Sequence, residues 1–162
     1  MRRVHDMDGV PELLGRHGRT GIVRRFVPGE PLTRRSAVSD AFFPRLQALI
    51  EAIHERGLAY VDLEKPCNIL LGSDGRPYLI DFQLAFCWPR RLLGNTWVIR
   101  AVRGAFQRSD LYHLHKHWRR VRPDQLSEDE LAASRAKPWP VRFGNVCMRP
   151  MKKIRRALTG RA

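Results

Sequence analysis

The sequence predicts an α+β fold that is mostly helical. Three features favour this class: a strand-like stretch near the N-terminus, a long amphipathic helix after it, and a β-hairpin followed by further helices. The 162 residues fit one domain, since a single domain typically holds ~100–200 residues. The hydrophobic share of 43% is enough to build a core.

The elements of the first half follow from local patterns. Residues 21–27 have the β-branched and aromatic content of a strand, which the following Pro and Gly residues end. Residues 39–56 have the spacing of an amphipathic helix, with Ser39 or Asp40 as the cap and Gly57 as the left-handed stop. The expected buried face of that helix consists of Phe42, Leu46, Leu49, Ile50 and Ile53.

The next stretch predicts a short strand and a hairpin. Residues 58–61 form the short strand, and residues 68–71 and 77–80 form the hairpin around the loop 72–76. Helices are then expected from Ser109–Asp110 onward.

Two more helices are expected near the C-terminus. Ser127 and Glu130 have the spacing of a capping box, which opens a short helix that Pro138 ends. The tail after Pro150 predicts the last helix. His113, His115 and His117 belong to the helix expected from Ser109, but residues two apart face different sides, so no zinc site is expected there.

The charge is unevenly distributed along the chain. The net charge is +14, and residues 87–162 hold 18 basic and only 5 acidic residues. This asymmetry favours an anionic partner, although an arginine-rich surface alone is the alternative. Residues 149–161 could form a basic amphipathic helix on an anionic membrane, or dock their apolar edge on the domain. Nucleic acid is not the expected partner, because no recognised binding module is present.

The sequence predicts neither a cleavable secretion signal nor paired cysteines. No apolar run reaches the roughly 18 residues of a membrane span, and no apolar stretch follows the basic start. Cys67, Cys87 and Cys147 are an odd number without paired spacing, so neither a disulfide framework nor a Cys-x-x-Cys zinc site is expected. A cytoplasmic location, with possible peripheral attachment to the inner membrane face, is the expectation.

Three polar residues stand at the ends of predicted strands. Asp62 directly follows one strand, Asn68 opens the hairpin, and Asp81 follows its second strand. A tight loop and a hairpin can bring these side chains to one place, where carboxylate and amide oxygens suit Mg²⁺ on substrate phosphates. A second carboxylate can accept a proton from a hydroxyl. Turn and cap roles for each residue are the alternative.

This stretch resembles the catalytic and metal-binding loops of the protein-kinase-like superfamily. The similarity rests on His54-x-x-Gly57, on Asp62 followed by Asn68-Ile69-Leu70, and on Ile80-Asp81-Phe82. The resemblance implies that Asp62 is the catalytic base and that Asn68 and Asp81 hold Mg²⁺ on the ATP phosphates.

Flanking residues extend the resemblance. Asn68 follows Asp62 by six positions, with Lys65 between them, which looks like the bacterial lipopolysaccharide-core sugar kinases. Lys65 would then contact the transferred phosphate, unless it is only a solvated loop lysine. The backbone of Arg25, Phe26 and Val27 would bind adenine.

The resemblance also implies domain limits and a partner. Residues 1–145 would form the kinase-like domain, with a small-lobe remnant (1–27), a hinge (28–32) and a large lobe (33–145), and residues 146–162 would form the basic tail. Within the large lobe, Ser109–Asp110 is similar to the start of the helix that braces the catalytic loop. The expected activity is ATP-dependent phosphorylation of a hydroxyl acceptor, either a sugar or anionic glycolipid or a protein Ser/Thr.

Four departures separate the chain from that family. No Gly-x-Gly-x-x-Gly is present, and about 20 residues before the hinge are too few for a whole small lobe. Tyr60-Val61 replaces the usual His-Arg, Gln83 replaces the usual Gly, and no Ala-Pro-Glu follows. The alternative is therefore a weakly active pseudokinase or partial lobe that acts as a binding module.

Overall fold

The computed structural model describes residues 4–18, 21–82, 85–87 and 97–135. In this part of the chain, helices and small antiparallel sheets are combined, which confirms the α+β class. The helices are α1 (Phe42–Glu55), α2 (Trp97–Val121) and α3 (Glu128–Arg135), with short 3₁₀ turns η1 (Pro66–Asn68) and η3 (Pro123–Gln125). The strands are β1 (Leu13–His17), β2 (Gly21–Arg24), β3 (Gly29–Pro31), β4 (Leu58–Ala59), β5 (Ile69–Gly72), β6 (Pro77–Leu79) and β7 (Phe86–Cys87).

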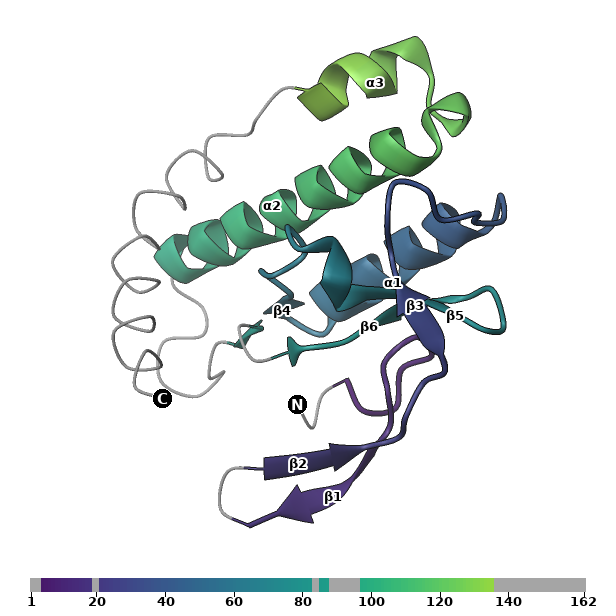
Figure 1. Ribbon diagram of the computed structural model, residues 1–162. Coiled ribbons are helices and arrows are strands. Elements are labelled where there is room, and N and C mark those ends of the chain that lie inside the picture. The colour runs from purple at the N-terminus through teal and green to yellow at the C-terminus, as the bar shows by residue number, and fades with distance from the viewer. Residues whose placement is uncertain (1–3, 19–20, 83–84, 88–96, 136–162) are drawn as a thin grey trace, which may run out of the picture.

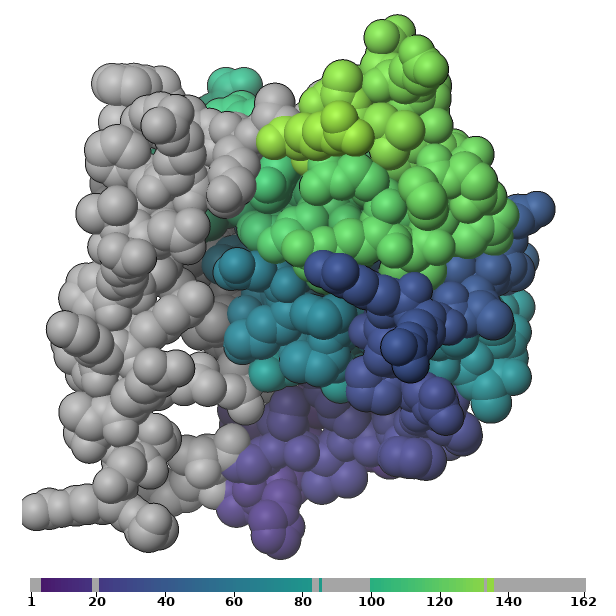
Figure 2. Space-filling view, turned by 45° about the horizontal axis from the view of Figure 1, so that its top comes forward, coloured from purple at the N-terminus to yellow at the C-terminus, as the bar shows by residue number. Residues whose placement is uncertain are grey.

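The long helix α2 lies between the other two helices, with α1 on one side and α3 on the other (Figure 1). The hairpin of β1 and β2 projects at the end of the molecule that lies away from α3 (Figures 1 and 2). This arrangement leaves the middle of the molecule to α1, the turn after β4 and the β5–β6 hairpin.

Three antiparallel sheets are present among the described residues. The predicted hairpin is confirmed, because β5 pairs with β6 and places Ile69 opposite Leu79. On its other edge β5 pairs with β3, with Gly29 opposite Gly72. The Pro and Gly residues around β3 were expected only to end a strand, and no local pattern predicts their pairing with a strand forty residues later. The remaining pairs are β1 with β2 and β4 with β7.

Helix α1 has the face that the sequence predicts. All five residues of the predicted apolar stripe are buried. The helix starts at Phe42, and Ser39 contributes its carbonyl, not its hydroxyl, to the first turn (Phe42 N to Ser39 O, 3.1 Å). Gly57 stops the helix as expected, since its φ of 76° lies in the left-handed region.

Helix α2 differs from the prediction at its start. It begins at Trp97, not at Ser109, so Asp110 lies in the middle of the helix. The polar pair at 109–110 resembles a cap, but the carboxylate of Asp110 is used by a distant loop. The capping box of α3 is confirmed, because Glu130 N donates to Ser127 Oγ (3.3 Å) and Ser127 N donates to the Glu130 carboxylate (2.9 Å). The predicted tail helix and Pro138 lie outside the described residues.

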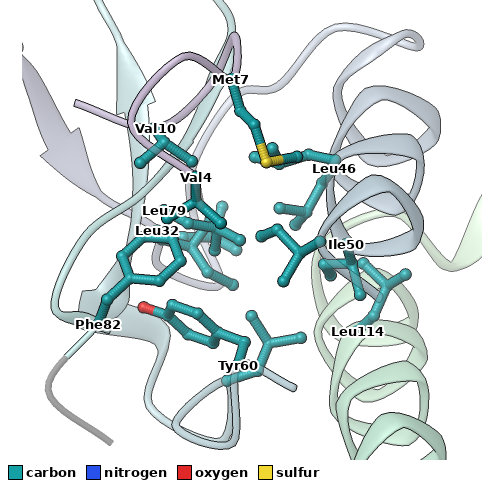
Figure 3. Close-up of a cluster of buried hydrophobic side chains, with 14 of the residues drawn as sticks. Val4, Met7, Val10, Leu32, Leu46, Ile50, Tyr60, Leu79, Phe82 and Leu114 are labelled. Atoms are coloured by element: carbon teal, nitrogen blue, oxygen red, sulfur yellow. The ribbon is translucent and has the colours of Figure 1, made fainter. Parts of the chain in front are cut away.

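One hydrophobic core joins these elements (Figure 3). Ile50 of α1, Leu79 of β6 and Leu114 of α2 are completely buried in it. Burial of such a side chain contributes roughly 1.5–3 kcal/mol. Tyr60 and Phe82 complete the core next to the predicted site, so the loops there rest on a packed base. None of the helices in the described ranges has the length and apolar character that a membrane span requires.

Candidate functional site

The buried carboxylate of Asp110 fixes the loop that carries Asp62. Asp110 is 1% exposed. Its oxygens accept hydrogen bonds from the backbone amides of Tyr60 and Val61, each at 2.8 Å. His54 Nε2 lies 2.9 Å from the same carboxylate. One side chain of α2 thereby holds α1 and the loop before Asp62 together.

The backbone is strained at two positions of the site. Among the described residues, the only non-glycine residues with positive φ are Val61 (70°) and Asp81 (60°). Such a conformation costs an L-residue roughly 1–2 kcal/mol, and a β-branched residue such as Val61 is especially unsuited to it. Strain of this kind is maintained where the surrounding contacts impose it, often at functional sites. Both positions coincide with the predicted site: Val61 precedes Asp62, and Asp81 is a predicted metal ligand.

Asp62 and Lys65 form a close ion pair. Lys65 Nζ lies 2.6 Å from Asp62 Oδ2. The side chain of Asp62 is 11% exposed and that of Lys65 is 43% exposed. The lysine therefore reaches from solvent to one oxygen of a largely buried carboxylate. The other oxygen, Oδ1, has no hydrogen-bond partner in the described part of the chain.

Asn68 connects Asp62 with the strand that leads to Asp81. Its side-chain Nδ2 donates to Asp62 O at 3.0 Å, and its backbone O accepts from Ile80 N at 3.0 Å. Asn68 is 5% exposed, whereas Asp81 is exposed. Asn68 therefore contacts the backbone of Asp62 and pairs with the residue before Asp81, at one end of the β5–β6 hairpin. Nδ2 is held by Asp62, and the amide oxygen Oδ1 accepts a contact from Cys67 Sγ at 3.8 Å.

Tyr60 is a part of the site whose role sequence reasoning missed. It is completely buried, its hydroxyl donates to the carbonyl of Ile80, and its ring meets Phe82 edge-on at 4.9 Å. Burial raises the pKa of Tyr60 far above its ordinary value, and the negative charges of Asp62 and Asp81 raise it further. The neutral phenol thus ties the loop before Asp62 to the residue before Asp81. The sequence showed only that this aromatic residue replaces the His usual in the family.

Arg24 is a second residue that the sequence did not single out. Its guanidinium lies over the ring of Phe82, 5.4 Å from the ring centre. Burial lowers the pKa of Arg24, and the negative charge of Asp81 opposes this effect. An arginine nevertheless stays charged at neutral pH, because its ordinary pKa lies far above 7. β2 thereby brings a positive charge to the side of the site that holds Asp81.

The segment predicted to bind adenine follows directly after Arg24. The amide of Arg25 is already used, because it donates to Glu12 O at 2.8 Å. Phe26 is 83% exposed. Within the described residues, the backbone amides of Phe26 and Val27 have no backbone partner. Phe26 and Val27 therefore offer backbone amides to a ligand, whereas the amide of Arg25 is occupied.

His117 of α2 supports the loop that carries Asp62. His117 Nε2 lies 2.8 Å from Leu63 O, next to Asp62. His113 is 6% exposed, and burial lowers its pKa to about 4. In the residues that can be described, no three His, Cys, Asp or Glu side chains come together as a metal centre.

Comparison with known proteins adds no assignment. A scan against protein-family models finds no match, and a search of the curated proteins finds none either.

Proposed function

We propose that this chain is a kinase-like phosphotransferase that moves the γ-phosphate of ATP to a hydroxyl acceptor. The main support is the hydrogen-bonded framework around the three predicted residues. Asp110 fixes the backbone before Asp62, and Asn68 links Asp62 with the strand end at Asp81. The strained backbone at Val61 and Asp81 adds to this support, because the fold keeps both residues in costly conformations.

The oxygens of Asn68 and Asp81 are the proposed ligands of Mg²⁺. Their chemistry suits the metal, since Mg²⁺ in phosphate-transfer sites takes one or two protein oxygens in addition to phosphate oxygens and water. When bound, Mg²⁺ neutralises charge on the phosphates. Arg24 would add a fixed positive charge on the same side. The exposed segment of Phe26 and Val27 would bind the adenine through its backbone.

Asp62 is the proposed base. Lys65 holds Oδ2, so Oδ1 is the oxygen that can accept the hydrogen of the acceptor hydroxyl. The acceptor oxygen then forms a bond to the γ-phosphorus, the bond from that phosphorus to the leaving ADP oxygen breaks, and the proton passes to Asp62. Lys65 lies close enough to Asp62 to stabilise the negative charge of the transferred group.

The proposal also includes the fold family and the chemical class of the acceptor. We infer a protein-kinase-like large lobe, with β1 and β2 as its small-lobe remnant. The six-residue spacing from Asp62 to Asn68 favours a sugar or anionic glycolipid acceptor over a protein Ser/Thr.

The test is Mg²⁺-dependent ATP turnover by the purified chain. Asp81→Ala should abolish turnover, whereas Asp129→Asn, which changes an exposed carboxylate on α3, should leave it unchanged. Turnover that persists in Asp81→Ala would overturn the assignment, as would turnover that needs no divalent cation.

A binding module is the second candidate, and the exposed apolar surface of the β1–β2 hairpin favours it. Leu14, Ile22 and Val23 are between 43% and 53% exposed, and Phe26 more so. A two-stranded sheet is marginal by itself in water, so a partner that covers these side chains would stabilise it. This candidate predicts that the isolated chain is not stabilised by ATP and Mg²⁺ in thermal unfolding.

Peripheral attachment to an anionic membrane completes the proposal. Residues 149–161, which carry the basic charge that supports this idea, lie outside the described residues. Removal of these residues should abolish sedimentation with vesicles that contain phosphatidylglycerol. Unchanged sedimentation would contradict a role of the tail.

A further inference from the structure

A groove of about 540 Å³ lies on α1, away from the predicted phosphotransfer site. Its opposite wall is the turn at residues 6–9, and its end is closed by the start of β6. Asp81 follows the other end of β6, so the groove and the site around Asp81 are separate. The volume falls within the ~300–1,000 Å³ typical of small-molecule sites. The groove is lined by Asp6, Met7, Asp8, Gly9, Arg45, Ala48, Leu49, Ala52, Arg56, Arg76 and Pro77.

The turn that forms one wall is fixed closely against the helix. Gly9 has a φ of 85°, and a Cβ atom there would lie 2.7 Å from Leu49 Cδ2. Its carbonyl accepts a hydrogen bond from Leu79 N at 2.8 Å. Any other residue at position 9 would have an unfavourable positive φ and would displace the side chain of Leu49. The groove is thus shaped by the fold itself and does not depend on the placement of long surface side chains alone.

The floor of the groove is apolar, and its rim is charged. Met7 and Leu49 are buried, and the small side chains of Ala48 and Ala52 leave room above them. Arg45 lies in the first turn of α1 and Arg56 is the residue that follows its last turn, so the two are roughly 16 Å apart along the helix axis. A molecule with a short apolar or sugar-like body and a charged end fits this distribution.

The charges of the rim favour an anion. Arg56 is paired with Asp6 through two hydrogen bonds, and Arg76 with Asp8 at 3.1 Å. Arg45 has no ion pair among the described residues. Arg76 also lies 3.9 Å from Asp74, so Arg56 and Arg76 both have carboxylate partners and Arg45 does not. An arginine without a carboxylate partner presents a planar set of donors, which matches the oxygens of a phosphate group.

We propose that this groove binds a small phosphate-bearing molecule, with Arg45 as the anchor of the phosphate. Met7, Ala48 and Leu49 contact the uncharged part of the ligand. The inference does not depend on phosphotransfer at Asp62 and Asp81, and its test contains no nucleotide and no divalent cation.

The test is isothermal titration of the chain with glucose 6-phosphate in buffer with EDTA, with glucose as the uncharged comparison. We expect binding of the phosphorylated sugar only. Arg45→Gln should weaken it about tenfold or more, because a charge-assisted contact is lost. Arg34→Gln is the matched control, since Arg34 is an exposed arginine outside the groove, and it should bind like the wild type.

Two further variants make the result decisive. Ala48→Phe fills the floor from an exposed helix position and should also abolish binding, with an unchanged melting temperature as evidence of folding. Asp81→Ala should bind glucose 6-phosphate normally, which separates this site from the phosphotransfer site. Equal affinity of Arg45→Gln and wild type, or no heat of binding with the wild type, would overturn the proposal.

Discussion

Replacement of Asp110 by Asn tests how the loop before Asp62 is held. The two carboxylate oxygens accept separate backbone amides, Val61 N on Oδ1 and Tyr60 N on Oδ2. Asn retains the volume but only one oxygen, so one buried N–H faces an NH₂ group. An unsatisfied buried donor costs roughly 1–3 kcal/mol. The strained φ of Val61 loses part of its restraint in addition. We therefore expect a destabilisation of about 2 kcal/mol.

The assay is urea unfolding, followed by tryptophan fluorescence at constant pH. With a urea dependence of about 1–3 kcal/mol per molar for a small protein, the midpoint should fall by about 1 M. Asp129→Asn provides the control, because an exposed substitution usually stays within about 0.5 kcal/mol. Asp110→Ala should cost more than Asp110→Asn, since it removes both acceptors. Equal midpoints for Asp110→Asn and wild type would refute the claim that this carboxylate holds the loop.

Three further predictions concern the framework of the fold. Gly57→Ala should lower the free energy of unfolding, measured in urea, by about 1–2 kcal/mol, because a φ of 76° is unfavourable for a residue with a Cβ atom. Crowding is not the reason, since the nearest neighbour of that atom would lie 3.7 Å away. An unchanged urea midpoint would contradict this explanation. Ser127→Ala should cost about 1 kcal/mol through loss of the capping box, and a Ser127→Asp variant that retains a cap should not. Stability should decrease as the pH falls from about 6.5 to about 4, because the pKa of His113 is lowered by burial to about 4 and only the unfolded chain binds the proton in this interval. His113→Gln should reduce that slope, and an identical pH profile for both proteins would contradict the role of His113.

The parts of the fold that the sequence predicted depend on local signals. The stripe of α1, the stop at Gly57 and the capping box of α3 all involve residues within a few positions of one another. The β5–β6 hairpin is equally local, because a four-residue loop joins its strands. Such patterns are set by backbone geometry and are visible in a single sequence.

The parts that were missed or wrong depend on contacts between distant residues. Pairing of β3 with β5 joins segments about forty positions apart, and a strand of three residues is too short to show a pattern that predicts this pairing. Helix α2 was expected to start at Ser109 because Ser-Asp is a good cap, but the carboxylate of Asp110 is used by a loop about fifty positions earlier. The bracing role of Asp110 came from resemblance to a family, not from the spacing of residues.

In the candidate site, too, local patterns predicted some residues, whereas contacts between distant residues determine the others. Asp62, Asn68 and Asp81 were predicted from their places at strand ends, and in the structure Asn68 hydrogen-bonds to Asp62 O and to Ile80 N, next to Asp81. Tyr60 and Arg24 were not found as parts of the site. Their roles arise from packing against Phe82 and from the charge of Asp81, which a sequence pattern does not encode.

Paramagnetic broadening by Mn²⁺ in place of Mg²⁺ examines the proposed metal ligands most directly. In a ¹⁵N-labelled chain with ATP present, the amide signals of Asn68 and Asp81 should disappear first. The signal of Gly75 at the other end of the hairpin should persist. Equal loss of all three signals, or loss confined to residues away from Asn68 and Asp81, would contradict a nucleotide–metal site at this end of the β5–β6 hairpin.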